Sequence, residues 1–383
     1  MGAAFDVAGQ SVYKPRTFFC IMQKLSTTLF FSVLFFAGCK IEQPLAPPQP
    51  ITAVPEQPVM MAPANVPPKP VAPPWQDLVF PTAQTGLLSG DLRVFMPANP
   101  AHPDSGLFGT VRNGAKGLSR FHEGLDIAPL HRDRRGEPTD EVHAVAKGVV
   151  AYVSSVAGNS NYGKYVVLLH NDPVGAVYTL YAHLASLAVK PGQTVQPGAP
   201  LGVMGHTSSS AIPRERGHVH FEIGLVNNER FAYWYRAQKL KPDHGNFHGQ
   251  NLTGVDPLAF LRWQRQNPEG SFRDFLATQP AAFELVVIPA HALDFFRRHP
   301  ALWEGAAWRA GAAVVLSCTE NGLPLKGRLA TEAERRSLGR TRVAVTKIDA
   351  AVLGRNGSHL VTPGRRGWML GQSGEHWLSA LCY

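Results

Sequence analysis

Two short pairs of polar residues in this sequence could bind a metal ion. His122 and Asp126 lie four positions apart, and His218 and His220 lie two positions apart much later in the chain. Catalytic zinc sites take three protein ligands from His, Asp or Glu and leave a fourth position open for water. His122, Asp126 and one of the two later histidines supply that number. The residues therefore predict a zinc site that activates water for hydrolysis.

Both pairs are expected on extended backbone rather than on helices. Gly124 within the first pair and Pro129 just after it disfavour a helix, so this is not the helical His-Glu-x-x-His arrangement of other zinc peptidases. The run 218–223 alternates polar and apolar residues, which predicts a strand. Because side chains alternate along a strand, His218 and His220 share one face. One imidazole can then bind metal while the other lies over the bound water.

Neither pair is specific by itself. A chain with 15 histidines contains chance pairs, and we expect a metal role for only about one isolated His-x-His in five. The specificity comes from the ordered motifs around the pairs. These motifs are Phe108 to Arg112, His122 to Ala128, Ala144 to Val150, Tyr162 to His170, Leu180 to Leu184, Val189 to Val195, Gly198 to Gly202, Gly205 to Thr207, His218 to Glu222 and Val255 to Pro257.

With these motifs, the region from about 106 to 258 resembles the lysostaphin-type (LytM-like) zinc endopeptidases of bacterial cell walls. The many short strands with Gly, Pro and Asn turns independently predict a mainly β, antiparallel domain. The resemblance implies a two-sheet β architecture with the metal in a groove floored by one sheet. It also implies hydrolysis of peptide cross-links in peptidoglycan.

The resemblance implies roles for five residues. His122, Asp126 and His220 match the family's zinc ligands, which predicts one zinc ion per chain. His183 and His218 match its two catalytic histidines that do not bind metal. An imidazole has an unperturbed pKa near 6.5, so it can accept or donate a proton near neutral pH. Which of the two histidines is the base stays open.

The sequence departs from the family pattern in three loops. The run Pro213 to Gly217 stands where the family commonly has Ser-Thr-Gly-Pro, and it lengthens the loop and adds two cations. The charged segment 130–141 and the aromatic-rich segment 225–253 resemble insertions. Loops around a rigid sheet commonly form the walls of a binding site. For the charged segment we expect a solvated surface loop instead.

Other polar residues are expected to be structural. His170 ends an apolar strand and should form local hydrogen bonds, and Asp256 should fix a turn. Ser208 to Ser210 lacks the Gly-x-Ser-x-Gly elbow of serine hydrolases. Five further histidines have no partner at ligand spacing, namely His131, His143, His206, His244 and His248.

The N-terminal segment predicts export. Residues 22–39 resemble a lipoprotein signal peptide, with the apolar run Leu29 to Ala37 and the ending Phe36-Ala-Gly-Cys39. Cys39 would carry the lipid that anchors the protein in the envelope membrane; the alternative is an ordinary secreted protein. Residues 1–21 are interpreted as a misassigned or dispensable extension. An exported, periplasmic protein has no nucleic-acid partner, so we assign the net charge of +9 to anionic wall polymers or membrane surfaces.

The rest of the chain divides into a linker and two predicted domains. Residues 40–75 form a Pro-rich linker, a semi-rigid tether of about 3.1 Å per residue. Residues 76–262 form the LytM-like domain, and 263–383 a small α+β accessory domain of unidentified family. In the accessory domain we expect strands at 283–288, 313–317 and 342–348 and helices at 293–306 and 330–337.

Cys318 and Cys382 are either paired, as export permits, or two buried free thiols. Two classes of function remain for the whole chain. One is a zinc endopeptidase of peptidoglycan, and the other is a catalytically silent family member that binds the wall or activates another hydrolase. Silent members characteristically lack a metal ligand, and none of the five site residues is missing here, so the enzyme is favoured. A zinc peptidase acting on some other protein also fits the site. The bond cut and the oligomeric state stay open.

Overall fold

The computed structural model describes residues 74–90, 92–95, 103–113 and 119–383. The predicted extension, the signal peptide with Cys39 and nearly all of the predicted linker lie outside these residues. The described residues all fall in one compact unit. Among the described helices, none is long and apolar enough to cross a membrane.

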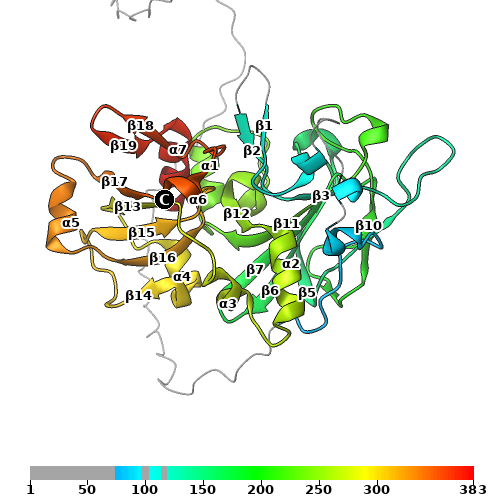
Figure 1. Ribbon diagram of the computed structural model, residues 1–383, viewed down its shortest axis with the longest axis horizontal. Coiled ribbons are helices and arrows are strands. Elements are labelled where there is room, and N and C mark those ends of the chain that lie inside the picture. The colour runs from blue at the N-terminus through cyan, green and yellow to red at the C-terminus, as the bar shows by residue number, and fades with distance from the viewer. Residues whose placement is uncertain (1–73, 91, 96–102, 114–118) are drawn as a thin grey trace, which may run out of the picture. The chain divides into compact units, whose positions relative to one another are not determined.

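The main sheet has seven strands, and all of its pairings are antiparallel. Its order is β12-β11-β7-β6-β5-β9, and β3 pairs with β11 as well (Figure 1). The strands are β3 (Leu125–Ile127), β5 (Gly148–Ser154), β6 (Tyr165–Asp172), β7 (Gly175–Ala182), β9 (Thr194–Val195), β11 (Val219–Val226) and β12 (Leu252–Val255). Every residue of β11 is buried, so the polar side chains on this strand lie inside the protein.

A smaller antiparallel sheet accompanies the main one. It has the order β4-β10-β8, formed by Glu141–His143, Pro200–Val203 and Ser186–Leu187. A separate hairpin pairs β1 (Val111–Asn113) with β2 (Ser119–Phe121). The predicted two-sheet antiparallel β architecture is therefore confirmed.

The C-terminal region mixes helices with a five-stranded sheet, as expected for an α+β fold. The sheet order is β14-β16-β15-β13-β17, and only its β14–β16 pairing is parallel. Its strands are β13 (Phe283–Val287), β14 (Trp303–Glu304), β15 (Val314–Cys318), β16 (Pro324–Leu329) and β17 (Val343–Ile348), followed by the hairpin of β18 (Val361–Gly364) and β19 (Gly367–Leu370). The helices of the chain are α1 (Phe231–Ala237), α2 (Pro257–Gln266), α3 (Phe272–Leu276), α4 (Asp294–Arg298), α5 (Glu332–Ser337), α6 (Ala350–Leu353) and α7 (Gln372–Leu381).

Most of the elements predicted for this region are present, but the helix predicted over 293–306 is wrong beyond its first turns. Helix α4 ends at Arg298, and Pro300 follows two residues later. Proline lacks an amide hydrogen and its ring clashes with the preceding helical turn, so it stops the helix. The remainder of the segment forms a 3-10 turn and strand β14, the parallel edge strand.

One hydrophobic core extends through both predicted domains. Trp75 is 1% exposed, and its ring contacts Phe260 and Phe272. Its indole nitrogen donates to Asp172 Oδ2 over 2.8 Å. The last residue of the predicted linker is thus an anchor in the core. Cys318 and Cys382 are both free thiols, as in the second alternative from the sequence. Cys318 is buried as expected, whereas Cys382 is only half-buried.

Candidate metal centre

The strand register brings two of the predicted ligands together. On β11, His220 lies opposite Asp126 of β3 on one side and opposite Ala182 of β7 on the other. Directly paired residues of antiparallel strands have Cβ atoms about 4.5–5.5 Å apart, so their side chains can meet. His183 follows Ala182 at the end of β7. The strand predicted over 218–223 therefore brings the site residues together, because it pairs with β3 on one side and with β7 on the other.

Gly124 allows the first motif to pass close to β11. A Cβ atom at Gly124 would lie 2.5 Å from the Phe221 carbonyl oxygen and 2.8 Å from the His220 ring. Any side chain there would push β3 away from β11. The glycine that argues against a helix in the sequence is thus required for the short distance between His122 and His220.

His122, Asp126 and His220 form a group whose ligand atoms could hold one metal ion. His122 Nε2 lies 3.1 Å from Asp126 Oδ1 and 3.1 Å from His220 Nδ1, and the latter two atoms are 3.0 Å apart. A tetrahedral zinc ion with bonds of about 2.0–2.1 Å separates its ligand atoms by roughly 3.3 Å. The triangle of donor atoms therefore has the size that zinc requires.

Hydrogen bonds to the far side of each ring fix which nitrogen faces this triangle. His122 Nδ1 lies 2.9 Å from the Leu107 carbonyl oxygen and must donate to it. His220 Nε2 lies 2.9 Å from Glu222 Oε1 and donates to that carboxylate. The lone pairs of His122 Nε2 and His220 Nδ1 then point at each other and at a carboxylate oxygen. Electron-rich atoms at this spacing need a cation between them.

Arg112 orients the carboxylate of the group. Its Nη2 donates to Asp126 Oδ2 over 2.5 Å, which leaves Oδ1 for the two histidines. Burial by itself would raise the pKa of Asp126, but the neighbouring His122, His218 and Arg112 hold it well below its usual value. Asp126 is therefore ionised, and a metal ion would meet a carboxylate rather than an acid. In the sequence, Arg112 belonged to one of the family motifs, but its role in orienting Asp126 was not predicted.

Glu222 is a site residue that sequence reasoning missed. It is 1% exposed and accepts hydrogen bonds from Tyr162 Oη (2.6 Å), Tyr178 Oη (3.0 Å) and His220. Burial opposes protonation of His220, yet its hydrogen bonds to Asp126 and Glu222 raise its pKa to about 10. The pocket around this ring thus favours a positive charge. The signal was present, because 218, 220 and 222 share one face of a strand.

His183 and His218 lie beside the metal group and beside each other, with ring centroids 4.8 Å apart. His183 Nδ1 donates to the Thr207 carbonyl (2.9 Å), and His218 Nδ1 donates to the Arg216 carbonyl (2.8 Å). Their Nε2 atoms are left as acceptors, and that of His218 is 3.4 Å from Asp126 Oδ1. Burial and the two nearby histidines hold the pKa of His183 well below its usual value, so this ring is neutral.

The backbone around these two histidines is held in an unusual shape. His183 has a φ of 64°, which is strained for a residue with a side chain. Its amide donates to the Tyr162 carbonyl, and the His218 amide donates to the Gly205 carbonyl. A Cβ atom at Gly205 would lie 2.8 Å from the His183 carbonyl oxygen, so only glycine fits there. The sequence could not reveal this strain at His183.

The charged segment 130–141 was expected to be a solvated surface loop. It lies at the surface, but it also binds a neighbouring loop. Most of its side chains are exposed, but Arg132 donates to the carbonyls of Arg214, Glu215 and Gly217. Glu137 pairs with Arg214 Nε at 2.7 Å. The charged segment thus holds the 213–217 loop, which departs from the family pattern, through hydrogen bonds and an ion pair. That loop supplies the Arg216 carbonyl to His218.

His170 and Asp256 have the local structural roles expected of them. His170 is 1% exposed and bonds to Lys147 O and Thr179 Oγ1, each at 2.8 Å. Asp256 caps α2 by accepting from the amides of Leu258 and Ala259. The five histidines without a ligand partner stay outside the metal group.

Comparisons with known proteins agree with this geometry. Residues 120–232 match the model of peptidase family M23, and this segment belongs to that family. An uncharacterized metalloprotease of Haemophilus influenzae is 35% identical over 139 residues, which are 36% of this chain and 24% of that protein. The uncharacterized lipoprotein YgeR of Escherichia coli is 27% identical over 150 residues, covering 39% of this chain and 42% of that protein.

One solved structure that this chain matches in part is the catalytic domain of the antimicrobial peptidase lysostaphin from Staphylococcus simulans. It is 22% identical, covers 41% of this chain and 89% of that domain, and has a TM-score of 0.27. The curated relatives are much longer than the part they share with this chain, which spans 15% of the cell division protein DipM of Caulobacter vibrioides.

Proposed function

We propose that this chain is a zinc-dependent endopeptidase that hydrolyses peptide cross-links of bacterial peptidoglycan. The observation that carries the proposal is the convergence of three donor atoms at 3.0–3.1 Å from one another, with two more imidazole nitrogens beside them. His122, Asp126 and His220 would hold the zinc ion. When bound, zinc lowers the pKa of its water ligand from about 15.7 towards 7 and polarises a carbonyl group.

The chain's own residues supply the proton transfers. His183 and His218 each present Nε2 as an acceptor, because a backbone carbonyl holds the proton on Nδ1. One ring can take a proton from the attacking water and deliver it to the leaving amine, while the other donates to the oxyanion once protonated. Both rings are buried, which strengthens these charge interactions.

The location is proposed from the N-terminal sequence, which lies outside the described residues. Export with lipid at Cys39 would place the enzyme in the periplasm, where the Pro-rich segment lets it reach the wall. D,D-cross-links between stem peptides fit that envelope better than glycine bridges. Incorporation of labelled palmitate that disappears in Cys39→Ser supports the anchor; unchanged labelling contradicts it.

A digest of purified peptidoglycan by the zinc-loaded protein, followed by mass spectrometry, tests the activity. We expect new free termini that identify the bond, and their loss with chelator and with His122→Ala. Intact muropeptides in the presence of stoichiometric bound zinc would instead favour the silent, wall-binding member of the family. Cleavage of an exported protein with the wall left intact would favour a different substrate.

A further inference from the structure

Two adjoining clefts lie between segments next to the metal centre and the C-terminal region, and none of the five site residues lines either cleft. The inner cleft has a volume of about 440 Å³ and is lined by Glu123, the residue after His122, and by Tyr162, which donates to Glu222. The outer cleft has a volume of about 600 Å³. Arg120, Glu123, Gly249 and Gln250 line both clefts. We call the continuous space the junction groove.

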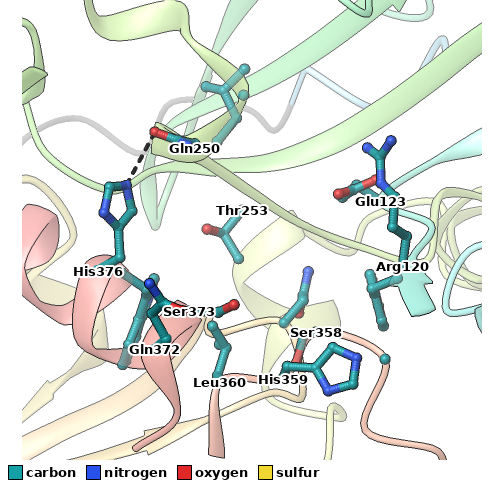
Figure 2. A pocket seen from close by; sticks show the side chains of 16 residues that line it. Arg120, Glu123, Gln250, Thr253, Ser358, His359, Leu360, Gln372, Ser373 and His376 are labelled. Carbon is teal, nitrogen blue, oxygen red and sulfur yellow. Dashed lines mark hydrogen bonds between the residues drawn. The ribbon is translucent and has the colours of Figure 1, made fainter. Parts of the chain in front are cut away.

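The outer cleft has one wall from each predicted domain. Arg120, Glu123 and Thr253 belong to the peptidase part, whereas Ser358 and Gln372 belong to the C-terminal region. Figure 2 shows Arg120 and Glu123 at one end of the cleft and His376 facing Gln250 at the other. The contact between His376 Nε2 and Gln250 Oε1 measures 3.4 Å and joins the two walls.

The C-terminal wall is fixed to the peptidase part. Asn228, which is fully buried, donates from Nδ2 to the Ala380 carbonyl of α7 over 2.8 Å. Asn321 Nδ2 donates to the Gly254 carbonyl of β12 over 3.0 Å. The His376 ring also packs on Trp234, with centroids 4.7 Å apart. A wall held by buried hydrogen bonds keeps its shape, so the groove is preformed for a ligand.

The lining of the groove suits a peptide that carries a free carboxylate. Six of the sixteen residues that line the outer cleft carry amide or hydroxyl groups, including Gln250, Thr253 and Gln372. Such groups pair with the donors and acceptors of a peptide backbone. Arg120 lines both clefts and Lys241 the inner one, while Glu123 is the only carboxylate among their described lining residues. The excess of cations attracts a carboxylate.

We propose that the junction groove binds the part of a cross-linked peptide that flanks the bond placed at the metal group. Gln372 and Ser373 at the start of α7 are then specificity-determining residues, and the C-terminal region is the second wall of the substrate site. This assignment rests on the proposed function and deepens it. It gives the region beyond Trp263 a role that its sequence does not indicate.

Kinetics on a long and a short substrate test the proposal. The long one is a cross-linked muropeptide dimer released from sacculi by a muramidase, and the short one is a synthetic peptide limited to the residues next to the cut bond. Gln372→Ala, which removes a hydrogen-bonding group, and Ser373→Trp, which fills the cleft, should lower kcat/KM on the dimer about tenfold, mainly through KM. The short peptide should change less than about twofold.

Glu375→Ala is the matched control, because Glu375 is exposed on the same helix and does not line the groove. It should leave both substrates unaffected, and thermal unfolding should show that all variants fold. Equal losses on both substrates, or no loss on the dimer, would overturn the proposal while leaving the peptidase intact.

Failure of the proposed function has a different signature, since the wild type would then cleave neither substrate. Calorimetric binding of an uncleaved disaccharide tetrapeptide still tests the groove in that case. Competition by the free tetrapeptide, weakened in Gln372→Ala, supports a peptide site. Competition by the disaccharide alone, or no binding, contradicts it.

Discussion

The main sheet holds buried histidines in two places, and only one of them is a site. His170 on β6 uses both ring nitrogens within the protein, one with the Lys147 carbonyl and one with Thr179. His183, at the end of β7, has a protein partner for Nδ1, and its ring lies 6.0 Å from the ring of His220 in the metal group. Burial lowers the pKa of both rings. Burial and a lowered pKa therefore do not distinguish the site histidine, His183, from the structural histidine, His170. The two rings differ in whether the second ring nitrogen has a hydrogen-bond partner within the protein.

The largest expected effect separates the two kinds of site histidine. His183→Ala should lower kcat by about 10²–10⁴-fold, the usual contribution of a general acid or base, while zinc content stays near one per chain. His122→Ala should lose both metal and activity. Metal analysis by plasma mass spectrometry beside a peptidoglycan digest measures both. Loss of zinc in His183→Ala would mean that this ring is a ligand.

The next effect concerns stability at the histidine that is not a site. Burial lowers the pKa of His170 to about 4 from the usual value of about 6.5, so the folded ring stays neutral while the unfolded chain takes up a proton. Its contribution is present above pH 6.5 and is lost as the pH falls toward 4. Between pH 7 and pH 5 the free energy of unfolding should fall by about 2 kcal/mol because of this residue.

His170→Gln tests that linkage, because an amide can keep hydrogen bonds but does not titrate. Urea unfolding at both pH values should show a smaller difference in the variant than in the wild type. Equal pH dependence in the two proteins would show that His170 is not the group responsible. Activity per folded molecule should be unchanged, in contrast to His183→Ala.

A smaller effect on activity is expected at the charged segment 130–141, which supports the loop that holds His218. Arg132 bonds to three carbonyls of the 213–217 loop, which in turn holds His218 through Arg216. Arg132→Ala should reduce kcat about tenfold at unchanged zinc content, since misplacement of a catalytic group by a fraction of an ångström is costly. Arg132→Lys should restore part of the activity.

Arg134→Ala is the control in the same charged segment, because Arg134 is also exposed but makes none of the three bonds that Arg132 makes to the 213–217 loop. The pH profile of kcat should change in Arg132→Ala and stay unchanged in Arg134→Ala. Identical pH profiles and identical kcat values in both variants would show that the charged segment 130–141 does not position His218.

The sequence predicted the strand of His218 and His220 and the two-sheet β fold because alternation and turn residues are local signals. The grouping of His122, Asp126 and His220 also followed from spacing and family order. Glu222 was missed as a partner, although the same alternation places it on the shared face. The clamp by Arg132 could not be predicted, because it joins segments about 80 residues apart. Long-range carbonyl acceptors leave no sequence pattern.

The C-terminal region shows where local signals fail. The helix expected over 293–306 ended early because Pro300 overrides the helical propensity of its neighbours. Strand β14 and helix α7 depend on contacts with distant partners, such as β16 for the former and Asn228 for the latter. The groove between the two regions was equally invisible, since its lining comes from segments that are far apart in sequence.

The smallest effect is expected at a histidine outside both buried groups. The His131 side chain is 74% exposed and lies 3.5 Å from Asp140, and exposed ion pairs contribute little. His131→Ala should therefore change neither zinc content nor turnover by more than about twofold. Metal analysis and the peptidoglycan digest, run beside His183→Ala, give the comparison. A clear loss of zinc would show that a solvent-facing histidine takes part in metal binding. The hydrogen-bond partner of the second ring nitrogen would then no longer be enough to distinguish a site histidine from a structural one.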